Sequence, residues 1–463
     1  MISTDTIVAL ATAPGMGAIA VIRLSGPAAL AVASQLFTSA SGKILQNQPS
    51  HTVHLGFVSD GERIIDQVLA TVFRNPHSYT GEDVVEWSCH GSTYIQQELL
   101  QLLLRNGLRL AEPGEFTLRA FLNGKIDLSQ AEAVGDLIQA SSASSHQVAL
   151  QQMRGGMSNS LKDLRQQLLD FASLMELELD FSEEDVQFAD RSQFLTLLSQ
   201  IRQLLQRLSD SFAIGNAIKQ GIPVAIIGAP NAGKSTLLNS LFNEERALVS
   251  EIAGTTRDSI EDTLYLKGLA YRFIDTAGIR ETLDTVEQLG IERTFNKVQL
   301  ASIVLYLVDV SQMNAQQLST AKTEMNELKD RFPDKIWLLL ANKSESITET
   351  DRQQVQQIWP DVLFISAKNR QGIDLLIDQL TNFVQWGTLG PDETVVSNSR
   401  HYGALMNALE AIDRVIEGMS VHLPTDLLTI DLHEVIDQIG SITGQVTHDE
   451  VLGNIFANFC IGK

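Results

Sequence analysis

The segment GAPNAGKST, Gly228–Thr236, decides the fold of the central part of the chain. It follows the apolar run IPVAII directly, and a helix-forming run, TLLNSLF, begins at its last residue. A strand, a loop with the pattern G-x-x-x-x-G-K-[ST] and a helix, in that order, form a phosphate-binding P-loop. Backbone N–H groups of the loop and the N-terminus of the helix can surround phosphate oxygens. The segment therefore predicts an α/β domain that binds a nucleotide.

Strand-like and helix-like segments alternate around this loop, from Gly221 to about Thr388. The strand-like runs are IPVAIIG, YRFIDT, IVLYLVDV, IWLLLANK and DVLFISAK. Such alternation predicts a mostly parallel sheet with helices on both faces. We expect this α/β domain to span residues 221–388.

The rest of the chain shows two other sequence patterns. Residues 1–118 mix β-rich runs with Gly and Pro breaks and one helical stretch, which predicts an α+β domain. Residues 119–220 and 389–463 carry Leu, Gln and Ala at helical spacing, which predicts long amphipathic helices. We expect a multidomain α+β protein in which the α/β domain is inserted into a discontinuous helical domain, because domains with adjacent termini tolerate insertion.

The composition limits the class of protein. The chain has 34 Lys and Arg against 56 Asp and Glu, and this net charge of −22 argues against non-specific coating of nucleic acid or anionic membrane. No Lys or Arg precedes the apolar N-terminal run, which Pro and Gly interrupt, so it does not match a signal peptide. The run IVLYLVDV has the length of a strand, far short of a membrane span. The two cysteines allow no disulfide framework, so we expect a cytoplasmic protein without a membrane partner.

Four further loop motifs follow in the order found in GTPases. GTTRD occupies Gly254–Asp258, and DTAG occupies Asp275–Gly278 after the strand-like run YRFI. NKSE, Asn342–Glu345, and SAK, Ser366–Lys368, each follow a later strand-like run. The ordered set resembles the translation-factor-related class of P-loop GTPases, and it predicts a Ras-like G domain.

These motifs suggest roles for individual side chains. Lys234 would bridge the β- and γ-phosphates, and the hydroxyl groups of Ser235 and Thr256 would bind Mg²⁺. Asp275 would lie behind the metal, and the N–H of Gly278 would contact the γ-phosphate. The predicted GTP-binding residues are Asn231, Ala232, Gly233, Lys234, Ser235, Thr236, Ser250, Glu251, Ile252, Ala253, Gly254, Thr255, Thr256, Asp275, Thr276, Ala277, Gly278, Asn342, Lys343, Glu345, Ser366, Ala367 and Lys368.

Two positions depart from the common GTPase pattern. Glu345 stands where an Asp normally accepts hydrogen bonds from guanine, and we expect it to make the same contact from a longer stem. Ile279 stands where Ras-like enzymes place the Gln that orients the attacking water. Two interpretations stay open. The chain is a slow nucleotide switch, or Glu287 orients the water while Asn231 holds a monovalent cation against the phosphates.

Five stretches together resemble one family. They are GAPNAGKSTLLN, IAGTTRD, DTAGIRET with VEQLGIER, the upstream PGEFTLRAFLNGKIDLSQAEAV and the terminal FCIGK. From residue 5 to its last residue the chain is similar to the tRNA-modification GTPases of the MnmE (TrmE) family, within the TrmE-Era-EngA-like class of P-loop GTPases. The resemblance implies hydrolysis of GTP with Mg²⁺ and K⁺, activated when two G domains meet.

The same resemblance implies partners and a reaction. It implies a homodimer that forms a heterotetramer with an FAD-dependent partner, MnmG (GidA). The complex would modify C5 of the wobble uridine of certain tRNAs, giving aminomethyl- or carboxymethylaminomethyl-type uridine. The carbon unit would come from 5-formyl- or methylene-tetrahydrofolate, bound by the N-terminal domain, which also forms the dimer.

Position by position, the resemblance assigns site residues in this chain. The implied catalytic residues are Glu287, Lys234 and Cys460. The implied K⁺ ligands are Asn231, Ser250, Ile252 and Thr255. The implied folate-binding residues are Arg23, Glu86, Lys125 and Lys463, whose charges suit the pterin N–H groups and the folate oxygens.

The cysteines raise separate questions. Cys460 lies where a prenylated C-a-a-X box would place it, but Gly462 and Lys463 do not fit such a box. A frayed tail and a functional thiol are the other interpretations, and the resemblance favours a thiol beside the folate pocket. Cys89 and His90 are neighbours on an expected strand, so their side chains point to opposite faces and form no nucleophile–base pair.

Seven cations are candidates for contact with RNA phosphates, although ordinary solvated helix faces are the favoured interpretation of each. They are Arg105, Arg109, Arg119, Lys125, Arg154, Lys162 and Arg165. Two other functions would need features that this sequence lacks. A ribosome-assembly GTPase, an RNA-binding switch, would carry a basic module, and a dynamin-like membrane GTPase would carry a lipid-inserting segment; the sequence offers neither.

Overall fold

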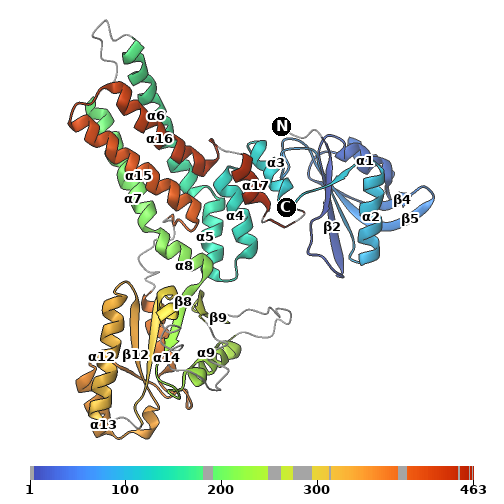
Figure 1. Ribbon diagram of the computed structural model, residues 1–463. Helices are drawn as coiled ribbons and strands as arrows, with labels where there is room; N and C mark the ends of the chain where they lie inside the picture. The colour runs from blue at the N-terminus through green and yellow to red at the C-terminus, as the bar shows by residue number, and fades with distance from the viewer. Residues whose placement is uncertain are drawn as a thin grey trace. The chain divides into compact units, whose positions relative to one another are not determined.

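The computed structural model describes residues 5–180, 191–248, 262–274, 295–311, 314–383, 394–446, 449–457, 459–460 and 462. The chain forms two compact units (Figure 1). The first unit comprises Met1–Ile138, Gln152–Arg202 and Asn407–Lys463. The second comprises Gln139–Gln151 and Gln203–Met406.

The N-terminal part of the first unit is a sheet with strand order β3-β4-β5-β6-β2-β1-β7. All its pairings are antiparallel except that of β7 with β1. The strands are β1 (Ile7–Leu10), β2 (Ile19–Ser25), β3 (Phe37–Ser39), β4 (Thr52–Asp60), β5 (Arg63–Phe73), β6 (Val84–His90) and β7 (Arg109–Leu110). The predicted α+β domain is confirmed.

Two helices cover one face of this sheet. Apolar side chains of α1 (Ala29–Leu36) and α2 (Thr93–Arg105) share a core with the strands, and Figure 1 shows both helices beside them. In β2 the buried residues alternate with residues of the other face, so Ala20 and Ile22 enter this core. Arg23 consequently lies on the face away from α1 and α2.

The remainder of the first unit is helical. Its helices are α3 (Glu115–Leu122), α4 (Leu128–Gln139), α6 (Gly156–Asp180), the first part of α7 (Arg191–Asp210), the later part of α15 (Ser399–Ser420), α16 (Thr425–Thr443) and α17 (Asp449–Ala457). Helix α5 (Ala143–Met153) falls mostly in the second unit. Figure 1 shows α6, α7, α15 and α16 running alongside one another.

Hydrogen bonds tie helices from distant parts of the chain together. Arg165 on α6 donates to the carbonyl of Ile436 on α16, with an N–O distance of 3.1 Å. Arg202 on α7 pairs with Asp413 on α15 at 2.6 Å. The helical domain is therefore discontinuous in sequence, as predicted. The boundary predicted after residue 118 falls inside α3, which runs from Glu115 to Leu122; the other domain boundaries stay predictions.

The second unit contains a sheet with strand order β13-β12-β11-β8-β10-β9. Only β9 is antiparallel to its neighbour. The strands are β8 (Ile222–Ile227), β9 (Asp262–Leu266), β10 (Leu269–Phe273), β11 (Ile303–Asp309), β12 (Ile336–Asn342) and β13 (Leu363–Phe364). The predicted mostly parallel sheet of a G domain is confirmed.

Helices cover both faces of this sheet. Residues of α12 (Ala315–Arg331) and α13 (Glu349–Ile358) share one core with the strands, and residues of α9 (Lys234–Leu248) and α14 (Ile373–Phe383) share the other. Figure 1 shows α12 and α9 on opposite sides of the strands. Helix α8 (Phe212–Gln220) leads directly into β8. None of the described helices combines the length and apolar character that a membrane span needs.

Candidate functional site

The P-loop connects β8 to α9 at the edge of the sheet where the parallel strands end. Register brings Ile227 of β8 opposite Tyr306, and Asp309, which ends β11, opposite Asn342, which ends β12. The loops that follow these strands therefore meet at one edge. This edge is where open parallel sheets bind their ligands.

Two glycines let the P-loop approach its neighbours closely. Gly228 has a φ of 146°, and a Cβ there would lie 2.1 Å from the carbonyl oxygen of Leu307 on β11. Gly233 has a φ of 98°, and its Cβ would lie 2.3 Å from Nδ2 of Asn342. Both distances are far below van der Waals contact, and both φ values disfavour side chains. The two glycines of the P-loop pattern are thus a steric requirement of this sheet edge.

Asn342 connects three of the predicted motifs. Its side chain is buried, with 2% of the residue exposed. Nδ2 donates to the carbonyl of Ala232 in the P-loop at 2.8 Å, and Oδ1 accepts from the N–H of Ala367 in the SAK motif at 3.0 Å. An unsatisfied buried amide costs about 1–3 kcal/mol, so these two bonds hold the motifs in a fixed arrangement.

The ammonium group of Lys234 is held within the P-loop. Its Nζ donates to the carbonyl oxygens of Gly228 and Ala229, both at 2.9 Å. Burial, followed by repulsion from Lys297, lowers the pKa of Lys234. A negative phosphate beside this ammonium group would stabilise its charged form. Ser235 and Thr236 are the second and third residues of α9, so both lie at the end of the helix that follows the P-loop. Ser235 is half-buried and Thr236 is exposed.

An ion pair that the sequence did not reveal shapes the NKSE loop. Lys343 has a φ of 64°, and its Nζ lies 2.5 Å from Oδ2 of Asp309. Asp309 also accepts from the N–H and Oγ of Ser311, at 3.0 and 2.6 Å. Burial raises the pKa of Asp309, but these hydrogen bonds outweigh it and the net shift is downward. In the sequence, this Asp is visible only as the next-to-last residue of the run IVLYLVDV.

The remaining described residues of the nucleotide site lie in the loops. Glu345 is exposed within the short 3-10 helix Ser344–Ser346. Ser366 is fully buried, and its Oγ accepts from the N–H of Asn369 at 3.2 Å, whereas Lys368 is exposed. Asn231 is exposed, with a φ of 64°.

Several predicted residues lie outside the part of the chain that the structure describes, so their roles stay predictions. They are Ser250, Glu251, Ile252, Ala253, Gly254, Thr255, Thr256, Asp275, Thr276, Ala277, Gly278, Ile279, Glu287 and Lys463.

A second set of predicted residues meets in the first unit. Arg23 and Glu86 are direct cross-strand partners on β2 and β6, and Nε of Arg23 lies 2.7 Å from Oε1 of Glu86. Nη1 of Arg23 donates to the carbonyl of Gly462 at 3.3 Å. The end of the chain therefore lies beside this pair. Gly462 has a φ of 99°, and a Cβ there would lie 2.3 Å from the carbonyl oxygen of Leu10, so the position requires glycine.

Aromatic rings flank Arg23. Its guanidinium carbon lies 5.5 Å from the ring centre of Tyr79 and 5.6 Å from that of Phe116, within the range of cation–π attraction. Burial raises the pKa of Tyr79, whose hydroxyl lies 2.8 Å from that of Thr117. The sequence did not single out Tyr79 or Phe116, because neither belongs to a spacing pattern.

The other described residues predicted for this set, Lys125 and Cys460, are exposed to solvent. Lys125 is exposed and donates to the carbonyl of Pro76 at 2.9 Å. Cys460 is an exposed free thiol. The structure thus brings Arg23, Glu86 and the chain end together, and it leaves Lys125 and Cys460 accessible to solvent.

Cys89 and His90 do not form a nucleophile–base pair. Cys89 is buried and its Sγ donates to the carbonyl of Ala20 at 3.4 Å. Burial, with a contribution from Asp66, raises the pKa of the Cys89 thiol to about 11. His90 extends from the opposite face and its Nδ1 lies 2.7 Å from Asp66. The predicted structural role is confirmed.

Most of the cations predicted to contact RNA have partners within the protein. Arg105 pairs with Asp60, Arg109 with Asp5 and Glu115, and Lys162 with Asp127. Arg165 bonds a backbone carbonyl of α16 and Lys125 that of Pro76, and Arg154 is exposed. Arg119 is only 6% exposed and pairs with Asp5, Glu82 and Glu115, so the prediction is wrong for this residue. The excess of carboxylates supplies these partners.

Comparisons with known proteins agree with this arrangement. A family model described as the MnmE helical domain matches residues 128–460, and one described as the N-terminus of the GTP-binding protein TrmE matches residues 6–125. The chain belongs to the MnmE family. The tRNA modification GTPase MnmE of Flavobacterium psychrophilum is 57% identical over 463 residues, covering 100% of both chains. Its namesake from Christiangramia forsetii is 56% identical, covering 99% of each.

A more distant MnmE relative, from Bacteroides thetaiotaomicron, is 52% identical and the match covers 99% of both chains. Among solved structures, the G domain of the T. maritima FeoB iron transporter is 22% identical, covers 35% of this chain and 99% of that chain, and has a TM-score of 0.26. That score is too low to bear on the fold.

The two thiols should differ sharply in reactivity. With iodoacetamide at pH 8, we expect Cys460 to be alkylated and Cys89 to stay protected, because a thiol with a pKa of about 11 is ionised to about one part in a thousand. Peptide mass spectrometry of the folded chain measures both rates, and the urea-unfolded chain is the control in which both react. Similar alkylation rates of Cys89 and Cys460 in the folded chain would contradict the assignment of Cys89 as a buried, unreactive thiol.

Proposed function

We propose that this chain is a GTP-hydrolysing enzyme that acts in tRNA modification. The observation that carries the proposal is the buried Asn342 amide, which joins the P-loop to the SAK motif at the carboxyl edge of a parallel sheet. Relatives that match over the full length support the tRNA substrate through the name tRNA modification GTPase.

Guanine recognition is assigned to the loops that Asn342 fixes. Glu345 is exposed in the NKSE loop, so its carboxylate is available to accept from the N1–H and N2–H₂ groups of guanine. The ion pair with Asp309 holds Lys343 in place, two positions before Glu345 in the same loop. Lys368 and the buried Ser366 complete the base-binding loops.

Hydrolysis in this proposal depends on residues of the P-loop and of the segments outside the described residues. The Ser235 hydroxyl at the start of α9 suits Mg²⁺, with Thr256 as a further ligand and Asp275 behind it; the ion would neutralise charge on the phosphates. Glu287 would orient the attacking water, since Ile279 has no polar group.

A potassium ion would complete the phosphate site. Asn231 is exposed in the P-loop, where its side-chain oxygen would serve as a ligand together with Ser250, Ile252 and Thr255. A cation there would stabilise the charge that develops on the phosphates during hydrolysis, which is the work that an arginine finger performs in other GTPases.

The set around Arg23 is proposed to bind the one-carbon donor, 5-formyl- or methylene-tetrahydrofolate. The Arg23–Glu86 pair offers hydrogen-bond donors and acceptors, and Gly462 lies beside it. Lys125 and Lys463 would bind the folate carboxylates. We further propose that the chain works as a cytoplasmic homodimer. With the FAD-dependent partner MnmG (GidA) it would form a heterotetramer that modifies C5 of the wobble uridine, with Cys460 near the transferred carbon.

Potassium should accelerate hydrolysis through Asn231. We expect GTP turnover to exceed ATP turnover, to be faster in KCl than in NaCl at equal ionic strength, and to rise with protein concentration. Removing one electrostatic contact of this type costs on the order of a hundredfold in rate. Phosphate release by the Asn231→Ala chain should therefore be slow and equal in both salts.

The control for this experiment is Gln316→Ala, an exposed residue of α12 outside the P-loop. It should retain the preference for KCl. Equal rates of the unaltered chain in KCl and NaCl would remove the cation role of Asn231, and equal turnover of ATP and GTP would contradict the proposed function.

Folate binding should depend on Arg23. Calorimetric titration of the full chain with 5-formyltetrahydrofolate should show saturable binding, and Arg23→Ala should weaken it about tenfold or more, because a hydrogen bond to a charged group contributes about 1.5–3 kcal/mol. Arg105→Ala, which removes a surface pair with Asp60, is the matched control and should bind normally. If the unaltered chain shows no saturable binding, the one-carbon proposal is wrong.

A further inference from the structure

Among the described residues, the outer edge of the sheet in the second unit is incompletely paired. Strand β13 consists of two residues, and its ladder with β12 joins only Leu340 to Leu363 and Ala341 to Phe364. Strand β12 begins four residues earlier, at Ile336, and pairs with β11 over its whole length. The first half of β12 therefore lies at the edge of the sheet, before β13 begins.

Hydrogen bonds show which backbone groups point outward there. The N–H of Ile336 donates to Ser302 and the carbonyl of Asn342 accepts from Val310, so these residues face β11. The carbonyl of Ala341 accepts from Ile365, on the β13 side. Backbone groups alternate along a strand, so those of Trp337 and Leu339 also point to the outer side. An edge of this kind can accept a further strand.

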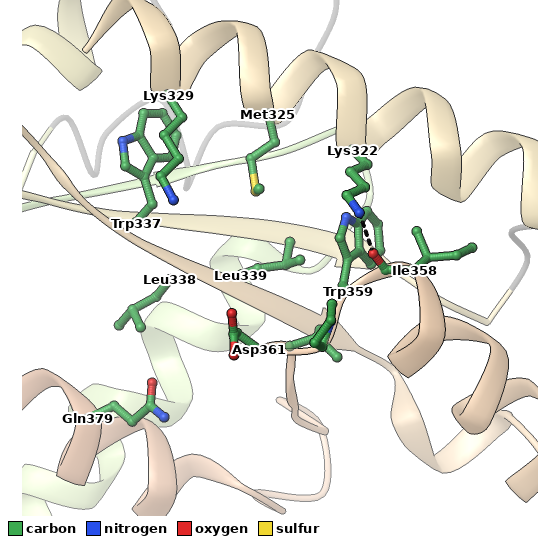
Figure 2. Close-up of a pocket in the computed structure, with 12 residues that line it drawn as sticks. Lys322, Met325, Lys329, Trp337, Leu338, Leu339, Ile358, Trp359, Asp361 and Gln379 are labelled. Atoms are coloured by element: carbon green, nitrogen blue, oxygen red, sulfur yellow. Dashed lines mark hydrogen bonds between the residues drawn. The ribbon is translucent and has the colours of Figure 1, made fainter. Parts of the chain in front are cut away.

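A pocket with a volume of about 690 Å³ lies at this edge. Its lining includes Trp337, Leu339 and Trp359, with Lys322 and Lys329 from α12. Figure 2 shows the two lysines descending from the helix toward β12, with Asp361 and Gln379 on the other side of the strand. The pocket thus opens on both faces of the sheet edge, as the alternating side chains of an added strand would require.

One residue in the wall of the pocket has an unpaired, buried hydrogen-bond donor. Trp359 is 3% exposed, and its indole Nε1 is buried without a hydrogen-bond partner among the described residues. Burying such a donor unpaired costs free energy, and because the atom is buried, neighbouring side chains would have to shift before a ligand could pair with it. Lys322 uses one of its three N–H donors on the carbonyl of Ile358, at 2.7 Å, and leaves two for a ligand.

The charge of the pocket selects the ligand. Lys322 and Lys329 are seven residues apart on α12, which places them two turns apart on the same face of the helix. They make this wall positive within a chain of net charge −22. Carboxylate side chains spaced along an extended segment would face these lysines. The pocket lies beside the first half of β12, whereas the nucleotide-site residue Asn342 ends that strand.

We propose that this edge binds an extended acidic segment of a partner protein, which adds a strand to the outer side of β12. The backbone of the segment pairs with Trp337 and Leu339, and its acidic side chains meet Lys322 and Lys329. Main-chain pairing supplies affinity and the alternate side chains supply selectivity, as in other strand-addition complexes.

A labelled peptide tests the proposal with the full-length chain. The probe is an acetylated peptide in which Glu and Val alternate, followed by fluorescence polarisation. We expect saturable binding, and binding weaker by about tenfold or more for the peptide in which Lys replaces Glu, since like charges repel. Lys329→Glu should reverse this preference. The control, Gln316→Glu with Ser319→Glu, changes the net charge equally outside the pocket and should leave the preference intact.

Backbone methylation separates strand addition from side-chain binding. Two versions of the Glu and Val peptide carry N-methyl groups either on every Glu or on every Val. Only one set of amides can face β12, so one version should lose binding and the other should retain it. Equal binding of the two versions, or no saturable binding of the unmethylated peptide, would overturn the proposal. Binding of both versions would instead indicate a site for isolated carboxylates.

Discussion

The buried amide of Asn342 is the constraint on which the nucleotide site depends. It ends β12, donates to the P-loop at Ala232 and accepts from the SAK loop at Ala367. Because Nδ2 would lie 2.3 Å from a Cβ at position 233, the P-loop must have glycine there. One side chain thus explains why three motifs far apart in the sequence occur together and why one glycine of the P-loop pattern cannot change.

In the first unit, too, pairing of neighbouring strands brings distant residues together. Arg23 and Glu86 are 63 residues apart in sequence, but they are direct partners across β2 and β6. Alternation along β2 places Arg23 on the face away from the apolar core. The glycine at position 462 then lets the end of the chain approach the carbonyl of Leu10 and offer its own carbonyl to Arg23. Within the FCIGK segment, Gly462 therefore lies against β1 and β2, which argues against a frayed chain at this position.

Hydrophobic runs and short motifs in the sequence were enough to predict individual strands and the P-loop. The run IVLYLVDV became β11, buried along almost its whole length, and the P-loop pattern lies between a strand and a helix as expected. The Asp309–Lys343 pair and the aromatic rings around Arg23 were missed, because each depends on contacts between residues brought together only by the fold. The RNA prediction for Arg119 failed partly for the same reason, since Asp5 and Glu82 come from other parts of the chain, although Glu115 lies four residues away on the same helix.

The mass of wobble uridines in tRNA tests the central claim most directly. Cells that lack this chain would be complemented with the unaltered chain or with Asn342→Ala, which removes both bonds of the buried amide. The account predicts unmodified wobble uridine without the chain, full modification with the unaltered chain, and little with Asn342→Ala present at equal abundance. Wobble uridines that stay modified in cells lacking the chain would contradict it.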